Sequence, residues 1–145
     1  MENFYSKVKT TKSHNPGYGS KHFIEIPFRM LIIGPSGSGK TNALLNLLKA
    51  MNDTWDHIYL CLKNADEPLY QMLIKKLGDD ITVFESGEVP DLSSIEKNGN
   101  QLMIFDDLVG DKAANESIAE YYKMARKKDI SCAYLSQSYF GVPKF

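Results

Sequence analysis

The stretch that decides the fold is Phe28-Arg29-Met30-Leu31-Ile32-Ile33-Gly34-Pro35-Ser36-Gly37-Ser38-Gly39-Lys40-Thr41. Its first half is an apolar run that predicts a buried strand, and its second half matches GxxxxGK[ST] at every fixed position. Glycines let the backbone wrap around phosphate groups, and a helix that starts at the end of the loop offers its amino end to the same anion. The predicted nucleotide-binding residues are Gly34, Pro35, Ser36, Gly37, Ser38, Gly39, Lys40 and Thr41. Lys40 is expected to reach the β- and γ-phosphates of ATP, and the Thr41 hydroxyl is expected to bind Mg²⁺.

Outward from this loop, helical patterns alternate with short apolar runs. Helices are predicted at 41–51, 68–77 and 112–127, with a turn or short helix within 90–100. Strands are predicted at 57–62, 81–84, 101–105 and 130–136. This alternation predicts a mostly parallel sheet between two helix layers, the three-layer α/β/α architecture of a P-loop NTPase. Ligands of such sheets bind beyond the carboxyl ends of the strands, so the chemistry is expected just after Ile33, Phe105 and Ser136.

An acidic pair follows one of these strands. In Leu102-Met103-Ile104-Phe105-Asp106-Asp107, four apolar residues fix the position of two carboxylates, as a Walker B strand requires. Asp106 is the predicted magnesium partner, and Asp107 is placed to orient or deprotonate an attacking water. The second acid favours hydrolysis of the nucleotide over binding alone or a GTPase switch. The alternative is a strand that ends in a solvated Asp-Asp turn.

The last predicted strand ends in an amide. In Tyr134-Leu135-Ser136-Gln137, the Gln137 side chain is placed to hydrogen-bond the γ-phosphate or the attacking water. The alternative is an ordinary polar residue after a strand.

Length and composition limit the other possibilities. The 145 residues suit one domain, with 43% hydrophobic residues and a formal net charge of −1. No apolar run approaches the length of a membrane span, and the first residues lack the apolar centre of a secretory signal. Cys61 and Cys132 form no CxxC pair and are expected to be buried free thiols in a reducing compartment. We expect a polar arm at 1–22 and a P-loop core at 23–145.

Basic residues gather in two places. Lys7, Lys9, Lys12 and Lys21 lie in the arm, and Arg126-Lys127-Lys128 lies near the end of the last helix. Such clusters can follow a phosphate backbone. They also suit a solvated arm and a helix end whose cations complement the helix dipole.

The order of these motifs is similar to that of a known family. It resembles the FtsK–HerA superfamily of DNA-pumping ATPases, which are of the RecA-like, additional-strand type, and within it the poxvirus-type genome-packaging ATPases of large DNA viruses and virophages. The loop motif alone is shared by many families, so the tail is the most specific part. The residues that carry the resemblance are Gly34–Thr41, Ile104-Phe105-Asp106-Asp107, Ala125-Arg126-Lys127-Lys128, Tyr134-Leu135-Ser136-Gln137-Ser138-Tyr139-Phe140 and Pro143-Lys144.

The resemblance implies a motor that moves double-stranded DNA into a capsid as a homo-oligomeric ring, in the host cytoplasm (the viral factory) or the virion. Members of the family bind nucleotide at subunit interfaces, where a neighbour supplies an arginine. Arg126 is the better candidate for this role, because Arg29 lies inside the first predicted strand; a helix-end cation is the alternative for Arg126. Family members usually continue beyond the glutamine strand, so the chain is expected to be a core that lacks its C-terminal part.

Two other classes of function also fit the loop. It looks like that of guanylate-type nucleotide kinases, but a kinase needs several arginines around the transferred phosphoryl group, and the chain has only Arg29 and Arg126. The second class is an assembly module that binds nucleotide without turnover.

Overall fold

The strands assemble into one parallel sheet in the order β1-β5-β4-β2-β3. The computed structural model describes residues 15–108 and 112–137. Within them, five strands are formed: β1 (Arg29–Ile33), β2 (His57–Cys61), β3 (Ile81–Phe84), β4 (Gln101–Asp106) and β5 (Ile130–Ser136). The mostly parallel sheet predicted from the sequence is confirmed.

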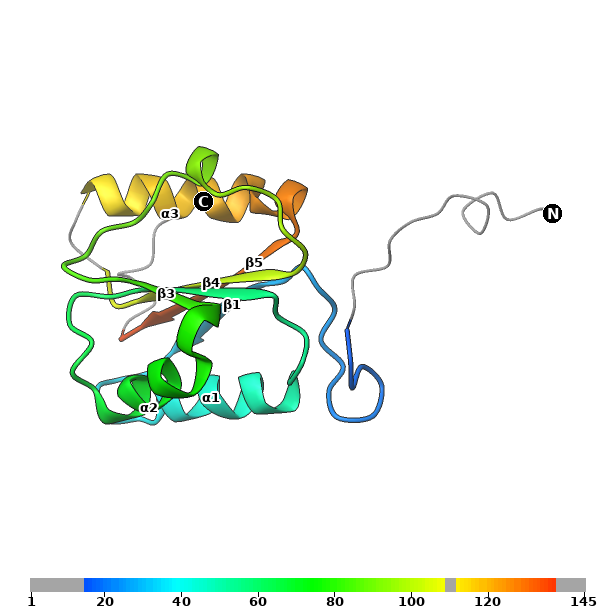
Figure 1. Cartoon of the computed structure of the whole chain (residues 1–145). Helices are drawn as coiled ribbons and strands as arrows, with labels where there is room; N and C mark the ends of the chain where they lie inside the picture. The colour runs from blue at the N-terminus through cyan, green and yellow to red at the C-terminus, as the bar shows by residue number, and fades with distance from the viewer. Residues whose placement is uncertain (1–14, 109–111, 138–145) are drawn as a thin grey trace.

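Helices cover both faces of this sheet. Figure 1 shows α1 (Lys40–Ala50) and α2 (Pro68–Leu77) on one face and α3 (Lys112–Met124) on the other. Short 3-10 helices connect them: η2 (Gly78–Asp80), η3 (Leu92–Ser94) and η4 (Ala125–Lys128). The three-layer α/β/α prediction is therefore confirmed. Among the residues that the structure describes, no helix is long and apolar enough to cross a membrane.

The position of β5 decides what meets at the carboxyl edge of the sheet. This strand lies between β1, which leads into the glycine-rich loop, and β4, which leads into the acidic pair. Parallel pairing brings all three carboxyl ends together. The backbone N–H of Gly34 donates to the carbonyl of Ser136 at 3.0 Å, and that of Asp107 donates to the carbonyl of Leu135 at 2.9 Å. An extra strand between the loop strand and the acidic strand is the additional-strand arrangement expected from the sequence.

Two apolar clusters hold the layers together. Phe105 and Tyr134 pack against Tyr121 of α3 on one face, and Leu60 and Leu102 belong to the cluster beneath α1 and α2 on the other. Every residue of β5 is buried, as are the first five residues of β4. The two strands that carry Asp106 and Gln137 are thus the most rigidly packed parts of the sheet.

Both cysteines lie in this core. Cys61 and Cys132 are buried and free, as predicted. Burial raises the pKa of each thiol to about 12, so both stay protonated near neutral pH.

Two predictions of local structure were wrong in part. The first strand was expected to be buried, but β1 lies at the edge of the described sheet, where β5 is its one neighbour among the described strands, and Leu31 is 39% exposed and Ile33 43% exposed. The last helix was expected to reach residue 127, but α3 ends at Met124 and the chain tightens into η4. Lys128 then donates its ammonium group to the carbonyls of Leu92 and Ile95, so this cation has a structural partner.

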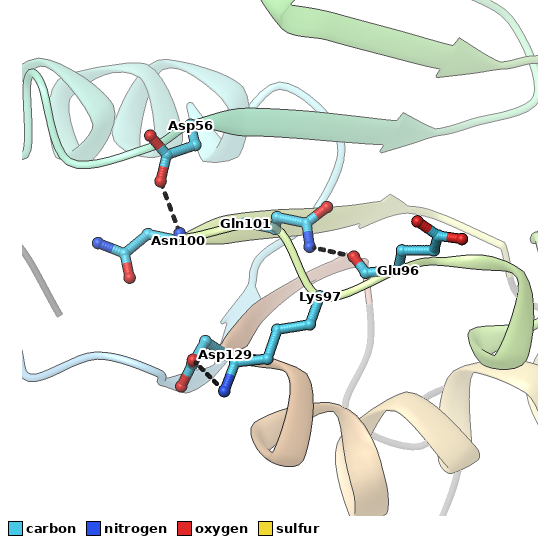
Figure 2. A network of polar contacts seen from close by, with 6 residues as sticks. All are labelled: Asp56, Glu96, Lys97, Asn100, Gln101 and Asp129. Atoms are coloured by element: carbon cyan, nitrogen blue, oxygen red, sulfur yellow. Dashed lines mark hydrogen bonds and ion pairs between the residues drawn. The ribbon is translucent and has the colours of Figure 1, made fainter. Parts of the chain in front are cut away.

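Polar contacts tie the opposite, amino edge of the sheet. Figure 2 shows the Asp56 carboxylate accepting the backbone N–H of Asn100 at 2.7 Å, which joins the segments entering β2 and β4. Lys97 forms an ion pair with Asp129, at the entrance to β5, with 3.3 Å between nitrogen and oxygen. These contacts fix the amino ends of the three central strands, and their carboxyl ends are aligned as a result.

Gly99 is placed to test this network. Its φ is +60°, and a Cβ atom there would overlap the Asp56 carboxylate. Gly99→Ala should therefore lower the free energy of unfolding by about 2–3 kcal/mol, from backbone strain together with loss of the Asp56–Asn100 hydrogen bond. Chemical denaturation measures the change.

Gly87→Ala is the matched control, because Gly87 also has a positive φ, of +77°, but open space for a Cβ atom. We expect it to lower the free energy of unfolding by only about 1 kcal/mol. Equal losses in the two variants would contradict the role given to Asp56.

Candidate nucleotide-binding site

A cleft of about 420 Å³ opens at the carboxyl edge of the sheet. The glycine-rich loop and the start of α1 form one wall, and Glu67 and Leu69 at the start of α2 form a second. Asp106, Asp107 and Gln137 form the third. The structure therefore brings together in one cleft the loop, the acidic pair and the glutamine that the sequence predicted separately.

The loop has the backbone conformation that its glycines allow. Gly37 and Gly39 have φ angles of 78° and 89°, in the left-handed region that favours glycine. Gly39 is the N-cap of α1, which has no side-chain cap and no acidic residue in its first turn. The backbone N–H groups at the amino end of α1 are thus available to an anion in the cleft.

Lys40 lies folded against the loop. Its ammonium group donates to the carbonyl of Gly34 at 2.7 Å and to that of Pro35 at 3.1 Å. These contacts hold the positive charge at the mouth of the cleft. If phosphate bound here, the Lys40 ammonium group could donate to a charged phosphate oxygen in place of a neutral carbonyl. The hydrogen bond to the charged acceptor is the stronger of the two.

The acids of the cleft repel one another. Burial raises the pKa of Asp106, the negative charges of Glu67 and Asp107 raise it further, and the Tyr70 hydroxyl and the Lys40 ammonium group oppose the shift. The ionised form of Asp106 is thus destabilised by the surrounding protein groups. A cation beside it would relieve both the desolvation and the repulsion.

Asp107 and Gln137 contact each other directly. The Gln137 side-chain amide donates to the Asp107 carboxylate at 3.2 Å. Asp107 has a φ of 50°, a left-handed conformation that Asp and Asn tolerate better than most residues. This turn carries the Asp107 side chain towards β5, so the predicted water-orienting acid and the predicted γ-phosphate amide form a pair.

The residues of the cleft fit a magnesium ion. Mg²⁺ prefers hard oxygen ligands and is usually held by one or two protein side chains together with phosphate oxygens. The Thr41 hydroxyl and the Asp106 carboxylate supply two such ligands beside the loop. Among the described residues there is no group of three or more acids, histidines or cysteines that could hold a metal ion.

Sequence analysis missed the wall that α2 contributes. The Glu67 carboxylate accepts the hydroxyl of Thr41 at 3.2 Å. The available signal was the strand at 57–61: it runs parallel to the others, so the loop after it also ends at the carboxyl edge. An acid directly before Pro68, at the start of a helix, could have been included on that ground.

Arg126 is not part of this cleft. It is exposed on η4, directly before the amino end of β5, and so lies at the opposite edge of the sheet. Arg29, at the start of β1, is also at that edge. The tail residues Ser138–Phe140 and Pro143-Lys144, which carry part of the family resemblance, lie outside the described residues, as do the lysines at 7, 9 and 12.

The sheet order and this edge of the sheet define the class of protein. A phosphate-binding loop after β1, an acidic pair after β4 and the intervening β5 make the chain a P-loop NTPase in its fold. The chain belongs to the family described as Poxvirus A32 protein, whose model matches residues 17–145.

Curated relatives support this membership. The chain is 29% identical over 141 residues to the DNA packaging protein OPG160 of vaccinia virus (strain Copenhagen), an alignment that covers 87% of this chain and 52% of that protein. It is 30% identical over 138 residues to DNA packaging protein OPG160 of variola virus, covering 85% and 50% respectively. The chain therefore spans about half the length of the curated relatives it matches.

A solved structure supports the fold. ATPases 2 and 3 of EccC from Thermomonospora curvata, in complex with a signal sequence peptide, align with a TM-score of 0.50 at 14% identity. The alignment covers 77% of this chain and 25% of that one. At this level of identity the likeness concerns the fold alone.

The repulsion at Asp106 can be tested through the thermal stability of a variant. Asp106→Asn removes the destabilised charge while keeping the side-chain shape, so it should raise the melting temperature without nucleotide or Mg²⁺ by about 2–4 °C, equivalent to about 1 kcal/mol for this size of domain. The added stabilisation by Mg²⁺ and ATP together should be lost.

Thermal unfolding at neutral pH measures both effects. Asp66→Asn is the control, because Asp66 is exposed and does not line the cleft; its melting temperature should stay within about 1 °C of wild type. A lower melting temperature for Asp106→Asn would show that the carboxylate stabilises the fold.

Proposed function

We propose that this chain is the ATP-hydrolysing core of a motor that packages double-stranded viral DNA into a capsid. The observation that carries the proposal is the placement of Asp107 and Gln137, in mutual contact, across the cleft from the glycine-rich loop. Membership of the Poxvirus A32 family and the names of the curated relatives support DNA packaging as the purpose of the hydrolysis.

The chemistry is assigned to four side chains. Lys40 leaves its carbonyl partners and binds the β- and γ-phosphates of ATP, while Thr41 and Asp106 hold Mg²⁺. Bound Mg²⁺ supplies positive charge that stabilises the phosphate oxygens during transfer. Asp107 orients a water molecule in line with the γ-phosphorus and accepts its proton.

Gln137 couples this step to movement. Its amide donates to the Asp107 carboxylate and can instead hydrogen-bond the γ-phosphate when ATP is bound. Loss of the phosphate returns Gln137 to Asp107 and so moves the loop that carries Gln137. In the complete motor, we propose, this movement translocates DNA.

Assembly into a ring accounts for the position of Arg126. Because this residue is exposed at the edge opposite to the cleft, it can reach a γ-phosphate only in a neighbouring copy that presents that edge to the cleft. We propose Arg126 as this arginine, capsid proteins as further partners, and the viral factory or the virion as the location.

Turnover tests the enzymatic part of the proposal. Lys40→Ala should lower both ATP binding and hydrolysis, because the loop loses the cation assigned to the β- and γ-phosphates. Asp107→Asn should bind ATP within about twofold of wild type but hydrolyse it about 100-fold or more slowly, since general-base catalysis contributes on that scale. Asn also tolerates the left-handed backbone at this position, so the loop is preserved.

Fluorescent-nucleotide binding and phosphate release measure the two properties separately. Wild-type turnover in Asp107→Asn would place the base elsewhere. Equal turnover in wild type and Lys40→Ala would leave only an assembly module that binds nucleotide.

The motor itself is tested with duplex DNA. The ATPase rate should rise several-fold on addition of duplex DNA, under conditions where light scattering shows an oligomer. Rapid phosphorylation of a nucleoside monophosphate in the absence of DNA would instead identify a nucleotide kinase.

A further inference from the structure

The amino end of α2 reaches the metal side of the cleft. Thr41 is buried at the start of α1, and its hydroxyl donates to the Glu67 carboxylate at 3.2 Å. A hydroxyl has one proton and two lone pairs. Because the proton is directed to Glu67, and so not to Asp106, the lone pairs of Thr41 are left for a cation.

The Glu67 side chain does not cap the helix that it precedes. Glu67 is the N-cap of α2, yet its side chain makes no capping hydrogen bond, and Pro68 at the first helical position has no N–H to offer. Its backbone carbonyl accepts the N–H of Gln71 at 3.0 Å, which fixes the main chain. The Glu67 carboxylate instead lines the cleft, where it accepts the hydrogen bond from Thr41.

A second polar group of α2 lies on the same side. Tyr70 is one turn beyond Glu67 and only 1% exposed, and its hydroxyl lies close to the Asp106 carboxylate and the Thr41 hydroxyl. The charge of Asp106 acts on this hydroxyl. The Tyr70 hydroxyl therefore adds a buried polar group beside the two expected magnesium ligands.

We propose that Glu67 is a positioning residue for magnesium, which accepts the proton of Thr41 and so turns the lone pairs of that hydroxyl toward the ion. Asp106 is then left to bind the ion directly.

This inference rests on the proposed function for the identity of the ligand, Mg²⁺ with ATP, but it is tested by binding and not by turnover. Fluorescent ATP is titrated with Mg²⁺, and separately bound in excess chelator, for wild type, Glu67→Ala and Glu67→Gln. Glu67→Gln keeps an oxygen that can accept the Thr41 proton and removes the charge. Asp66→Ala controls for loss of a nearby exposed negative charge.

Glu67→Ala should raise the Mg²⁺ concentration for half-saturation about fivefold, the scale of one hydrogen bond near solvent, while binding without Mg²⁺ stays within about twofold. Glu67→Gln and Asp66→Ala should both stay within about twofold of wild type. Unchanged Mg²⁺ dependence in Glu67→Ala overturns the proposal. If Glu67→Ala weakens ATP binding equally in excess chelator, the proposal is also overturned, since Glu67 would then act on the structure of the loop.

If Glu67→Gln raises the Mg²⁺ concentration for half-saturation as much as Glu67→Ala does, the effect comes from the charge of Glu67 and the positioning role is wrong. The failure of the proposed function looks different. Wild type would then bind Mg²⁺ and ATP together but release no phosphate, and the Mg²⁺ dependence of the variants would still decide the role of Glu67.

Discussion

The insertion of β5 between β1 and β4 is the constraint on which the rest of the site depends. Two backbone hydrogen bonds, from Gly34 to Ser136 and from Asp107 to Leu135, fasten the phosphate-binding loop and the acidic turn to the same strand. Gln137 follows that strand directly. Since β5 is buried throughout, the positions of all three groups are set by core packing and not by the flexibility of surface loops.

That arrangement brings negative charges together. Asp106 is desolvated at the end of a buried strand and faces two further carboxylates, those of Glu67 and Asp107. The Lys40 ammonium group donates to the neutral carbonyls of Gly34 and Pro35, so it only partly offsets the negative charge of these acids. A site strained in this way gains stability when phosphate and a cation enter together, because each offsets a charge that the other leaves. Under the proposed function, relief of this repulsion would contribute to the binding of nucleotide and Mg²⁺.

Much of this fold follows from local sequence. Pro68 and Gly78 mark the limits of α2, and the glycine-rich loop marks the junction of β1 and α1, so these elements were predicted closely. The edge position of β1 could not be predicted, because strand order depends on pairing between segments some 100 residues apart, as Met30 and Ala133 are. The left-handed turn at Asp107 likewise depends on its hydrogen bond to Leu135. Glu67 was missed because its partner Thr41 becomes a neighbour only when β2 pairs with β4.

The central claim is that a water molecule held in this cleft attacks the γ-phosphate of ATP. Incubation with ATP and Mg²⁺ in water enriched in ¹⁸O, followed by mass analysis of the products, tests it directly. The account predicts ADP and inorganic phosphate carrying one ¹⁸O atom, with none in the ADP. Phosphate formed without ¹⁸O, or γ-phosphate transferred to another acceptor, would contradict it.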